Sequence, residues 1–223
     1  LPIFTRYLGP EDYGILAYTS SVIEFLFVFS VLSLNSYVLR FWMDFAPGDD
    51  AGRRRLIGAV FSFLCAFNVV IMAGGFSLGP LAVSGLGIQV PFFPYFALAL
   101  ISNFFNMTSV LPLAVFRLLD RPAQYVGLTV SRSLLQYGVA YVLVVHLGWG
   151  ILGMYVAQAG VYAVFSLLYL RVIWRHGSFT WDLGLVRKGL LFSLPLLPGV
   201  MSHLVIRLID RLMLEAWVSL DRL

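Results

Sequence analysis

Six long apolar stretches, separated by short polar loops, constrain the fold of this 223-residue chain more than any other feature. Each is at least as long as the ~20 residues that an α-helix needs to cross ~30 Å of hydrocarbon. Charged residues make up 12% of the chain, about half the share typical of soluble domains. The sequence therefore predicts an all-α, polytopic transmembrane helix bundle. The stretches cover residues 13–39, 56–83, 91–116, 125–145, 151–170 and 189–210.

The distribution of Lys and Arg predicts which side of the membrane each loop faces, because cytoplasmic loops are enriched in these residues. Alternate loops differ strongly in their cations. One set contains Arg40, Arg53, Arg54, Arg55, Arg117, Arg121, Arg171, Arg175, Arg187 and Lys188, and the opposite set contains Arg6, Arg211 and Arg222. We expect the first set to be cytoplasmic. The net charge of +4 then reflects membrane topology, and we expect no nucleic-acid partner.

An acidic side chain, Glu24, lies near the middle of the first stretch. Ser20 and Asn35 fall on the same face of a continuous helix. Acids inside membranes are rare and usually face an interior cavity, so we expect Glu24 to line a cavity or a coupling-ion site. The alternative is that Glu24 hydrogen-bonds to a neighbouring helix and serves packing alone.

Arg132 lies about two turns inside the fourth stretch, on a face with Thr129 and Gln136. Two interpretations remain open: the guanidinium faces a ligand together with Gln136, or it extends back to the membrane interface. Amide side chains elsewhere in the stretches are expected to join helices by hydrogen bonds. These amides are Asn103, Asn106 and Gln158.

The last stretch combines two prolines with a polar face. Pro195 and Pro198 remove backbone donors and predict a bent or loosened helix. Beyond them, His203 and Arg207 recur at helical spacing with Asp210, which indicates a face turned towards a polar interior. We expect Asp210 to pair with Arg207. His203 has two interpretations, a hydrogen-bonded packing residue or a functional group of the cavity.

Motifs of enzymes are not found in this sequence. The three histidines are far apart, and no P-loop or HExxH motif occurs. The pattern G-x-S-x-G occurs at residues 75–79, GFSLG, but inside an apolar stretch and not at the strand-to-helix turn that a nucleophile elbow requires. Cys65 is the only cysteine and lies in an apolar stretch, which excludes a disulfide framework or a thiolate metal site within this chain. We therefore expect a protein that is not an enzyme and that uses neither a metal nor a cofactor.

Two short segments resemble one family. Residues 6–14, RYLGPEDYG, resemble the outer turn after the first helix in flippases for lipid-linked oligosaccharides, the polysaccharide-biosynthesis branch of the superfamily that includes multidrug and toxin extruders. Residues 191–198, LFSLPLLP, with Asp210 and Arg211 downstream, are similar to the seventh helix of that family. The resemblance implies a two-lobed, MATE-like transporter. Residues 1–188 would be its N-terminal lobe, from the end of helix 1 to helix 6, and residues 189–223 the truncated first helix of the C-terminal lobe.

The resemblance also implies a central cavity, open alternately to each side, that holds the pyrophosphate and sugars of a polyprenyl-linked glycan. Arginine suits phosphate because its fork makes paired hydrogen bonds. From depth and helical face, the predicted cavity residues are Glu24, Arg132, Gln136, His203 and Arg207. We expect transport of a lipid-linked oligosaccharide across the bacterial plasma membrane for polysaccharide, O-antigen or capsule export, with membrane lipid and a coupling cation as further partners. The alternatives are a cation-coupled multidrug extruder of the same fold and a membrane-embedded glycan polymerase or ligase.

Overall fold

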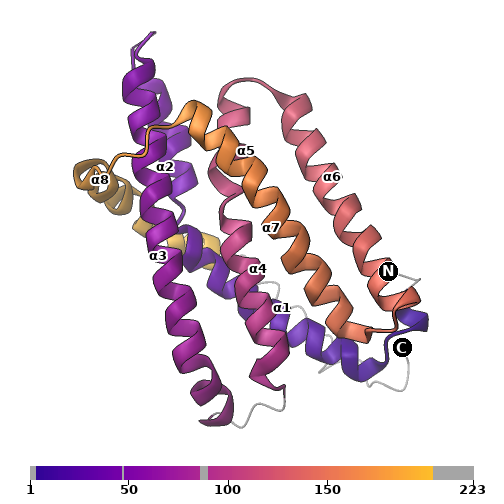
Figure 1. Ribbon diagram of the computed structural model, residues 1–223. Coiled ribbons are helices and arrows are strands. Elements are labelled where there is room, and N and C mark those ends of the chain that lie inside the picture. The colour runs from indigo at the N-terminus through magenta and orange to yellow at the C-terminus, as the bar shows by residue number, and fades with distance from the viewer. Residues whose placement is uncertain (1–3, 47, 86–89, 203–223) are drawn as a thin grey trace.

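The computed structural model describes residues 4–46, 48–85 and 90–202. Within these ranges the regular elements are helical, and six helical segments are long and apolar enough to cross a membrane (Figure 1). The predicted all-α, polytopic bundle is thereby confirmed. The assignment of residues 1–188 and 189–223 to two lobes stays a prediction.

The longer helices form an upright bundle with one oblique member. In Figure 1, α3, α4, α7 and α6 run side by side, and α1 crosses them at a slant. The helices are α1 (Pro10–Val31), α2 (Leu34–Phe41), α3 (Asp50–Gly85), α4 (Ala97–Met107), α5 (Val110–Leu118), α6 (Pro122–Tyr141), α7 (Gly150–His176) and α8 (Leu183–Ser193). Short helical turns are η1 (Phe4–Arg6), η2 (Trp42–Asp44), η3 (Phe92–Phe96), η4 (Val142–His146) and η5 (Leu194–Leu196).

The first apolar stretch does not form one continuous helix, and this expectation was wrong. Leu32 and Ser33 adopt left-handed backbone conformations, with φ of 51° and 53°, and divide the stretch into α1 and α2. The left-handed region is uncommon for residues other than glycine. The backbone therefore needs support from its surroundings at this point.

Side chains from three other helices supply that support. The Nδ2 of Asn68 on α3 donates to the Ser30 carbonyl at 2.8 Å, and the Nδ2 of Asn103 on α4 donates to the Ser30 hydroxyl at 2.8 Å. The Ser193 hydroxyl on α8 donates to the Ser33 carbonyl at 3.2 Å. Carbonyls at the end of a helix lack intrahelical partners, so Asn68 occupies an acceptor at the end of α1. Asn103 and Ser193 add bonds to the hydroxyl of Ser30 and to the carbonyl of Ser33, which also accepts the Ser36 N–H.

The last span begins earlier than the sequence indicated. Helix α8 starts at Leu183, because the Asp182 carboxylate accepts the backbone N–H groups of Gly184 at 3.0 Å and Leu185 at 3.1 Å and caps the helix. The helix then tightens into the 3₁₀ turn η5, which contains Pro195. The expected interruption of the α-helix occurs at Pro195, as a tighter 3₁₀ turn, whereas Pro198 lies in the helical residues that follow.

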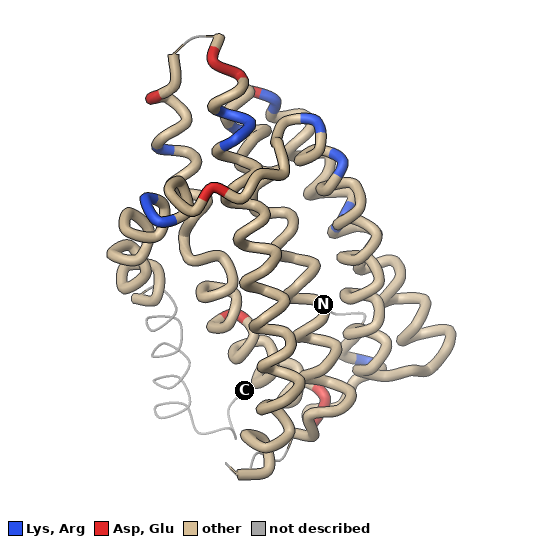
Figure 2. Tube along the Cα trace, turned by 60° about the vertical axis from the view of Figure 1, so that its left-hand side comes forward, with Lys and Arg blue, Asp and Glu red and all other residues tan. Residues whose placement is uncertain are grey.

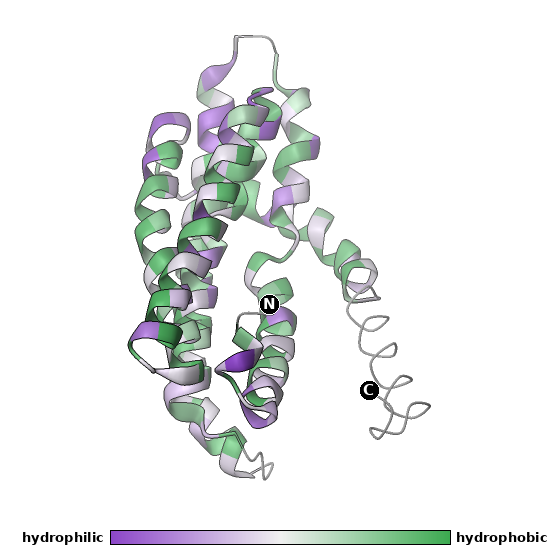
Figure 3. Cartoon of the chain, turned by 90° about the vertical axis from the view of Figure 1, so that its right-hand side faces the viewer, coloured by the Kyte–Doolittle hydropathy of each residue, from purple (hydrophilic) through white to green (hydrophobic). Residues whose placement is uncertain are grey.

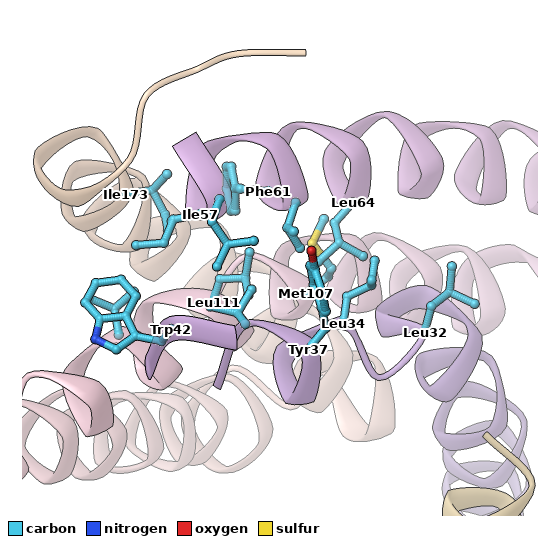
Figure 4. Packing of buried hydrophobic residues seen from close by; sticks show 14 of the residues in the cluster. Leu32, Leu34, Tyr37, Trp42, Ile57, Phe61, Leu64, Met107, Leu111 and Ile173 are labelled. Carbon is cyan, nitrogen blue, oxygen red and sulfur yellow. The ribbon is translucent and has the colours of Figure 1, made fainter. Parts of the chain in front are cut away.

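A compact apolar core joins α2, α3, α5 and α7 near one end of the bundle. Figure 4 shows side chains from these elements meeting, among them Leu34, Ile57, Leu111 and Ile173. Elsewhere, hydrophobic residues extend along the helices, and hydrophilic residues gather mainly near helix ends and loops (Figure 3). Lys and Arg are concentrated at one end of the molecule (Figure 2). This arrangement is typical of a multi-pass membrane protein.

Candidate functional site

A polar cavity of about 520 Å³ lies between α1, α4 and α7. This volume falls within the ~300–1,000 Å³ typical of ligand pockets. Glu24 lines the cavity, at mid-length of α1. The remaining lining residues are Ser20, Ile23, Phe27, Val28, Ser102, Asn103, Asn106, Gln158, Tyr162 and Val200. A carboxylate, three amides and three hydroxyl groups therefore line one cavity of an apolar bundle, and Ser20 and Glu24 are exposed there.

Arg132 on α6 is joined to the wall of this cavity. Its guanidinium Nη1 donates to the Oδ1 of Asn106 at 3.0 Å, and its Cζ lies 4.8 Å from the ring centroid of Tyr162. Both partners line the cavity. The side chain thus extends into the bundle, towards α4 and α7, and a cation–π contact of this kind adds to the hydrogen bond.

A second polar cavity of about 350 Å³ adjoins the first, because both are lined by Phe27, Val28 and Val200. Its polar residues include Asn35 on α2, beyond the helix break, and Arg117 near the end of α5. The Arg117 Nη2 donates to the Tyr125 hydroxyl at 2.7 Å. Polar side chains therefore line the two adjoining cavities from Glu24 to Arg117. Arg117 lies near the end of the bundle where Lys and Arg are concentrated.

Gln136 does not join this group. It is half-buried on α6 and is not among the lining residues of either cavity. His203, Arg207 and Asp210 lie outside the described residues. The structure therefore brings Glu24 and Arg132 to one cavity, and their roles in binding stay predictions.

Two contributors to the cavity were not recognised as candidate residues. Tyr162 lies four residues after Gln158 on α7, and Ser102 lies four residues before Asn106 on α4. Residues at this spacing share a helical face. The polar residues of each helix therefore carried a periodic signal that could have identified both positions. Among the described residues, no group of three His, Cys, Asp or Glu side chains is placed to hold a metal ion.

The fold and this site define a class: a multi-pass helical membrane protein with a polar cavity inside its bundle. A family model, described as polysaccharide biosynthesis protein, matches residues 1–222. The chain belongs to this family, whose members are membrane proteins of polysaccharide synthesis or export. Comparisons with curated proteins and with solved structures gave no match.

Proposed function

We propose that this protein is a flippase that moves a polyprenyl-pyrophosphate-linked oligosaccharide across a bacterial plasma membrane by alternating access. The observation that carries this proposal is the polar cavity with Glu24 and Asn106, to which Arg132 is attached. Burying unpaired polar groups in hydrocarbon is costly. A glycan headgroup therefore needs such a lined passage, whereas its polyprenyl tail does not.

The lining groups match the chemistry of this substrate. Amide and carboxylate side chains such as Asn106 and Glu24 can exchange hydrogen bonds with sugar hydroxyls, and a guanidinium pairs well with pyrophosphate oxygens. The bond from Arg132 to Asn106 keeps the cation oriented until an anion competes for it. We propose that transport involves no covalent step and no cofactor, with the glycan, membrane lipid and a coupling cation as partners.

The test replaces Arg132 by Ala in the intact protein, in cells without another copy. We expect surface glycan to be lost while the lipid-linked glycan accumulates on the inner leaflet and the protein level in the membrane stays normal. Arg187→Ala is the control, since Arg187 is exposed on α8 and does not line the cavities described above. Normal surface glycan in Arg132→Ala would contradict the assignment of this cavity.

Glu24 supports a second candidate, a cation-coupled multidrug extruder of the same fold. A carboxylate inside a cavity is a suitable site for a coupling proton or metal cation. This function predicts drug efflux that Glu24→Gln abolishes, with surface glycan unchanged. The same variants, Arg132→Ala and Glu24→Gln, also test for a polymerase or ligase. That function would be favoured if single glycan units reached the outer leaflet but were not polymerised there.

A further inference from the structure

A separate groove of about 470 Å³ lies between the start of α6 and the end of α7. Figure 2 shows that Lys and Arg are concentrated at this end of the molecule. Arg121, Arg171 and Arg175 line it, together with apolar residues that include Leu128 and Leu168. It shares no lining residue with the two cavities of the transport site. The groove is therefore a feature that the proposed transport function does not use.

The three arginines are exposed side chains that line one groove. In the part of the chain that the structure describes, none of them forms an ion pair, and no acidic side chain lines the groove. Arg55, at the same end of the molecule, differs, because it pairs with Asp182 at 2.8 Å. Arg171 and Arg175 are one helical turn apart, where like charges repel each other. An anion placed between the arginines would remove this repulsion.

Membrane topology accounts for part of this pattern. An excess of cations on the cytoplasmic side explains why arginines occur at this end of the bundle. Membrane topology also places the start of α6 beside the end of α7, because these helices are antiparallel neighbours. It does not account for the groove between them, in which apolar side chains lie beside the arginines.

The groove also has an apolar end on the bilayer side. Leu128 lies seven residues beyond Arg121 on α6, and Leu168 lies seven residues before Arg175 on α7. Seven residues of helix span about 10 Å. Arg121 and Arg175 therefore lie at the helix ends, and Leu128 and Leu168 lie about two turns deeper. Arg171 lies between these levels, three residues from Leu168. This is the order of a lipid headgroup and its acyl chain.

We propose that this groove binds an anionic phospholipid of the cytoplasmic leaflet. The phosphate lies between Arg121, Arg171 and Arg175, and an acyl chain lies along Leu128 and Leu168. Arginine forks bind phosphate oxygens in pairs. Basic pockets between transmembrane helices are suited to anionic headgroups.

The first test removes the charges of the groove. The intact protein, purified in a neutral detergent, is titrated with dioleoyl phosphatidylglycerol or dioleoyl phosphatidylcholine, and its Tm is measured. The groove variant is Arg121→Gln/Arg171→Gln/Arg175→Gln. The control variant, Arg54→Gln/Arg187→Gln/Lys188→Gln, removes the same charge from exposed residues outside the groove.

We expect phosphatidylglycerol to raise the Tm of the wild type and of the control variant by about 5 °C at roughly a hundredfold excess over Kd. The groove variant should show little shift, and phosphatidylcholine should have little effect on any variant. An equal loss of response in the control variant would overturn the proposal, because it would mean general attraction between charges. Equal stabilisation by phosphatidylcholine would overturn it too.

The second test fills the apolar end and leaves every charge in place. Gly127 on α6 lines the groove, and a Cβ added there meets no atom within 4 Å. Gly127→Leu should therefore fold and abolish the response to phosphatidylglycerol. Gly138→Leu is the matched control, since Gly138 lies on the same helix, is equally open and does not line the groove.

Two further results would overturn the proposal, one from the second test and one from titration of the wild type with inorganic phosphate. One is an unchanged response to phosphatidylglycerol in Gly127→Leu. The other is stabilisation of the wild type by millimolar inorganic phosphate alone that equals the effect of the lipid, because the groove would then bind a free anion and not a phospholipid.

Discussion

Single amide side chains join the helices of this bundle. Asn103 donates to Ser30 across α4 and α1, and Asn106 accepts from Arg132 across α4 and α6. The expectation that these two amides connect helices is confirmed. Hydrogen bonds between helices in membranes contribute about 0.6 kcal/mol on average and up to about 1.7 kcal/mol. Each bond is therefore modest, and its importance depends on which acceptor it satisfies.

Asn68→Leu should lower the free energy of unfolding by about 1–2 kcal/mol, because the Ser30 carbonyl at the end of α1 loses its partner in a buried position. Unfolding in mixed micelles with increasing denaturing detergent measures this value. Ser77→Ala is the control, since the Ser77 hydroxyl is exposed and bonds only within α3. If Asn68→Leu changed the free energy of unfolding by less than about 0.5 kcal/mol, another group would have to donate a hydrogen bond to the Ser30 carbonyl in the variant.

At the scale of elements, the position of each span could be predicted, but the break between α1 and α2 could not. Length and apolarity alone identify a membrane-crossing helix, and Pro195 marked the disturbance in the last span. Leu32 and Ser33 carry no comparable signal, because neither is Gly or Pro. Their conformation depends on Asn68 and Ser193, which are distant in sequence.

The candidate site was predictable to a similar degree. The cost of burying charge singles out Glu24 and Arg132 in any sequence of this kind. The partners of Arg132 were not predictable, because the contacts with Asn106 and Tyr162 depend on which helices are neighbours. Gln136 shares a face with Arg132 in sequence, yet of the two only Arg132 contacts residues that line the cavity among the interactions described above.

The break predicts an unusual response to substitution at Ser33. Ser33→Val should destabilise the protein by about 1 kcal/mol or more, because a β-branched residue is strained at a φ of 53°. Ser33→Gly should be neutral or stabilising by up to ~1 kcal/mol. Ser36→Val, within α2, should lower the free energy of unfolding by less than ~0.7 kcal/mol, because only the difference in helix propensity applies there. Thermal unfolding of the three variants would show this order, and a Ser33→Gly variant less stable than Ser33→Val would refute it.

The start of α8 predicts a dependence of stability on pH. Hydrogen bonds from the backbone, first from Leu185, and the neighbouring Arg55 hold the pKa of Asp182 below its usual value. Its stabilisation is therefore complete above the pKa of an unfolded aspartate, ~3.9, and is lost as pH falls through the lower folded pKa. Asp182→Asn keeps a capping oxygen but removes the charge.

We expect Asp182→Asn to lower the Tm at pH 7 and to reduce the loss of Tm between pH 7 and pH 3. Asp182→Ala, which also removes the cap, should have the lower Tm of the two at both pH values. Equal pH dependence in the wild type and Asp182→Asn would show that this carboxylate does not contribute to it.

At the scale of the whole molecule, a close seam joins α3 to the loop between α7 and α8. The Ser178 N–H donates to the Arg54 carbonyl at 3.0 Å, and Arg55 pairs with Asp182. A Cβ at Gly58 would overlap the Ser178 carbonyl. The seam therefore holds the last described span against the rest of the bundle.

Gly58→Ala should destabilise the protein by about 1–3 kcal/mol, the usual cost of overpacking. Gly74→Ala, on the same helix, should be neutral or favourable by up to ~1 kcal/mol, since no atom lies within 4 Å of the added Cβ. Thermal unfolding of both variants in detergent makes the comparison. Equal stability of the two variants would mean that the loop with Ser178, between α7 and α8, moves away from the added methyl group without a loss of stability.

The contacts of Arg132 have a consequence for how α6 is oriented. Most side chains of this helix are exposed or half-buried, and Val126, Val130 and Leu134 remain outside the bundle. Lipid tails are as apolar as such residues, so hydrophobicity gives α6 little preference for one rotation about its own axis.

The contacts of Arg132 with α4 and α7 favour one rotation of α6. The bond from Arg117 to Tyr125 and the packing of Leu128 and Val139 on α7 contribute to the same orientation. Under the proposed transport function, a substrate that draws the guanidinium away would remove two of the contacts that orient α6, so that binding at the cavity would loosen the orientation of a lipid-facing helix.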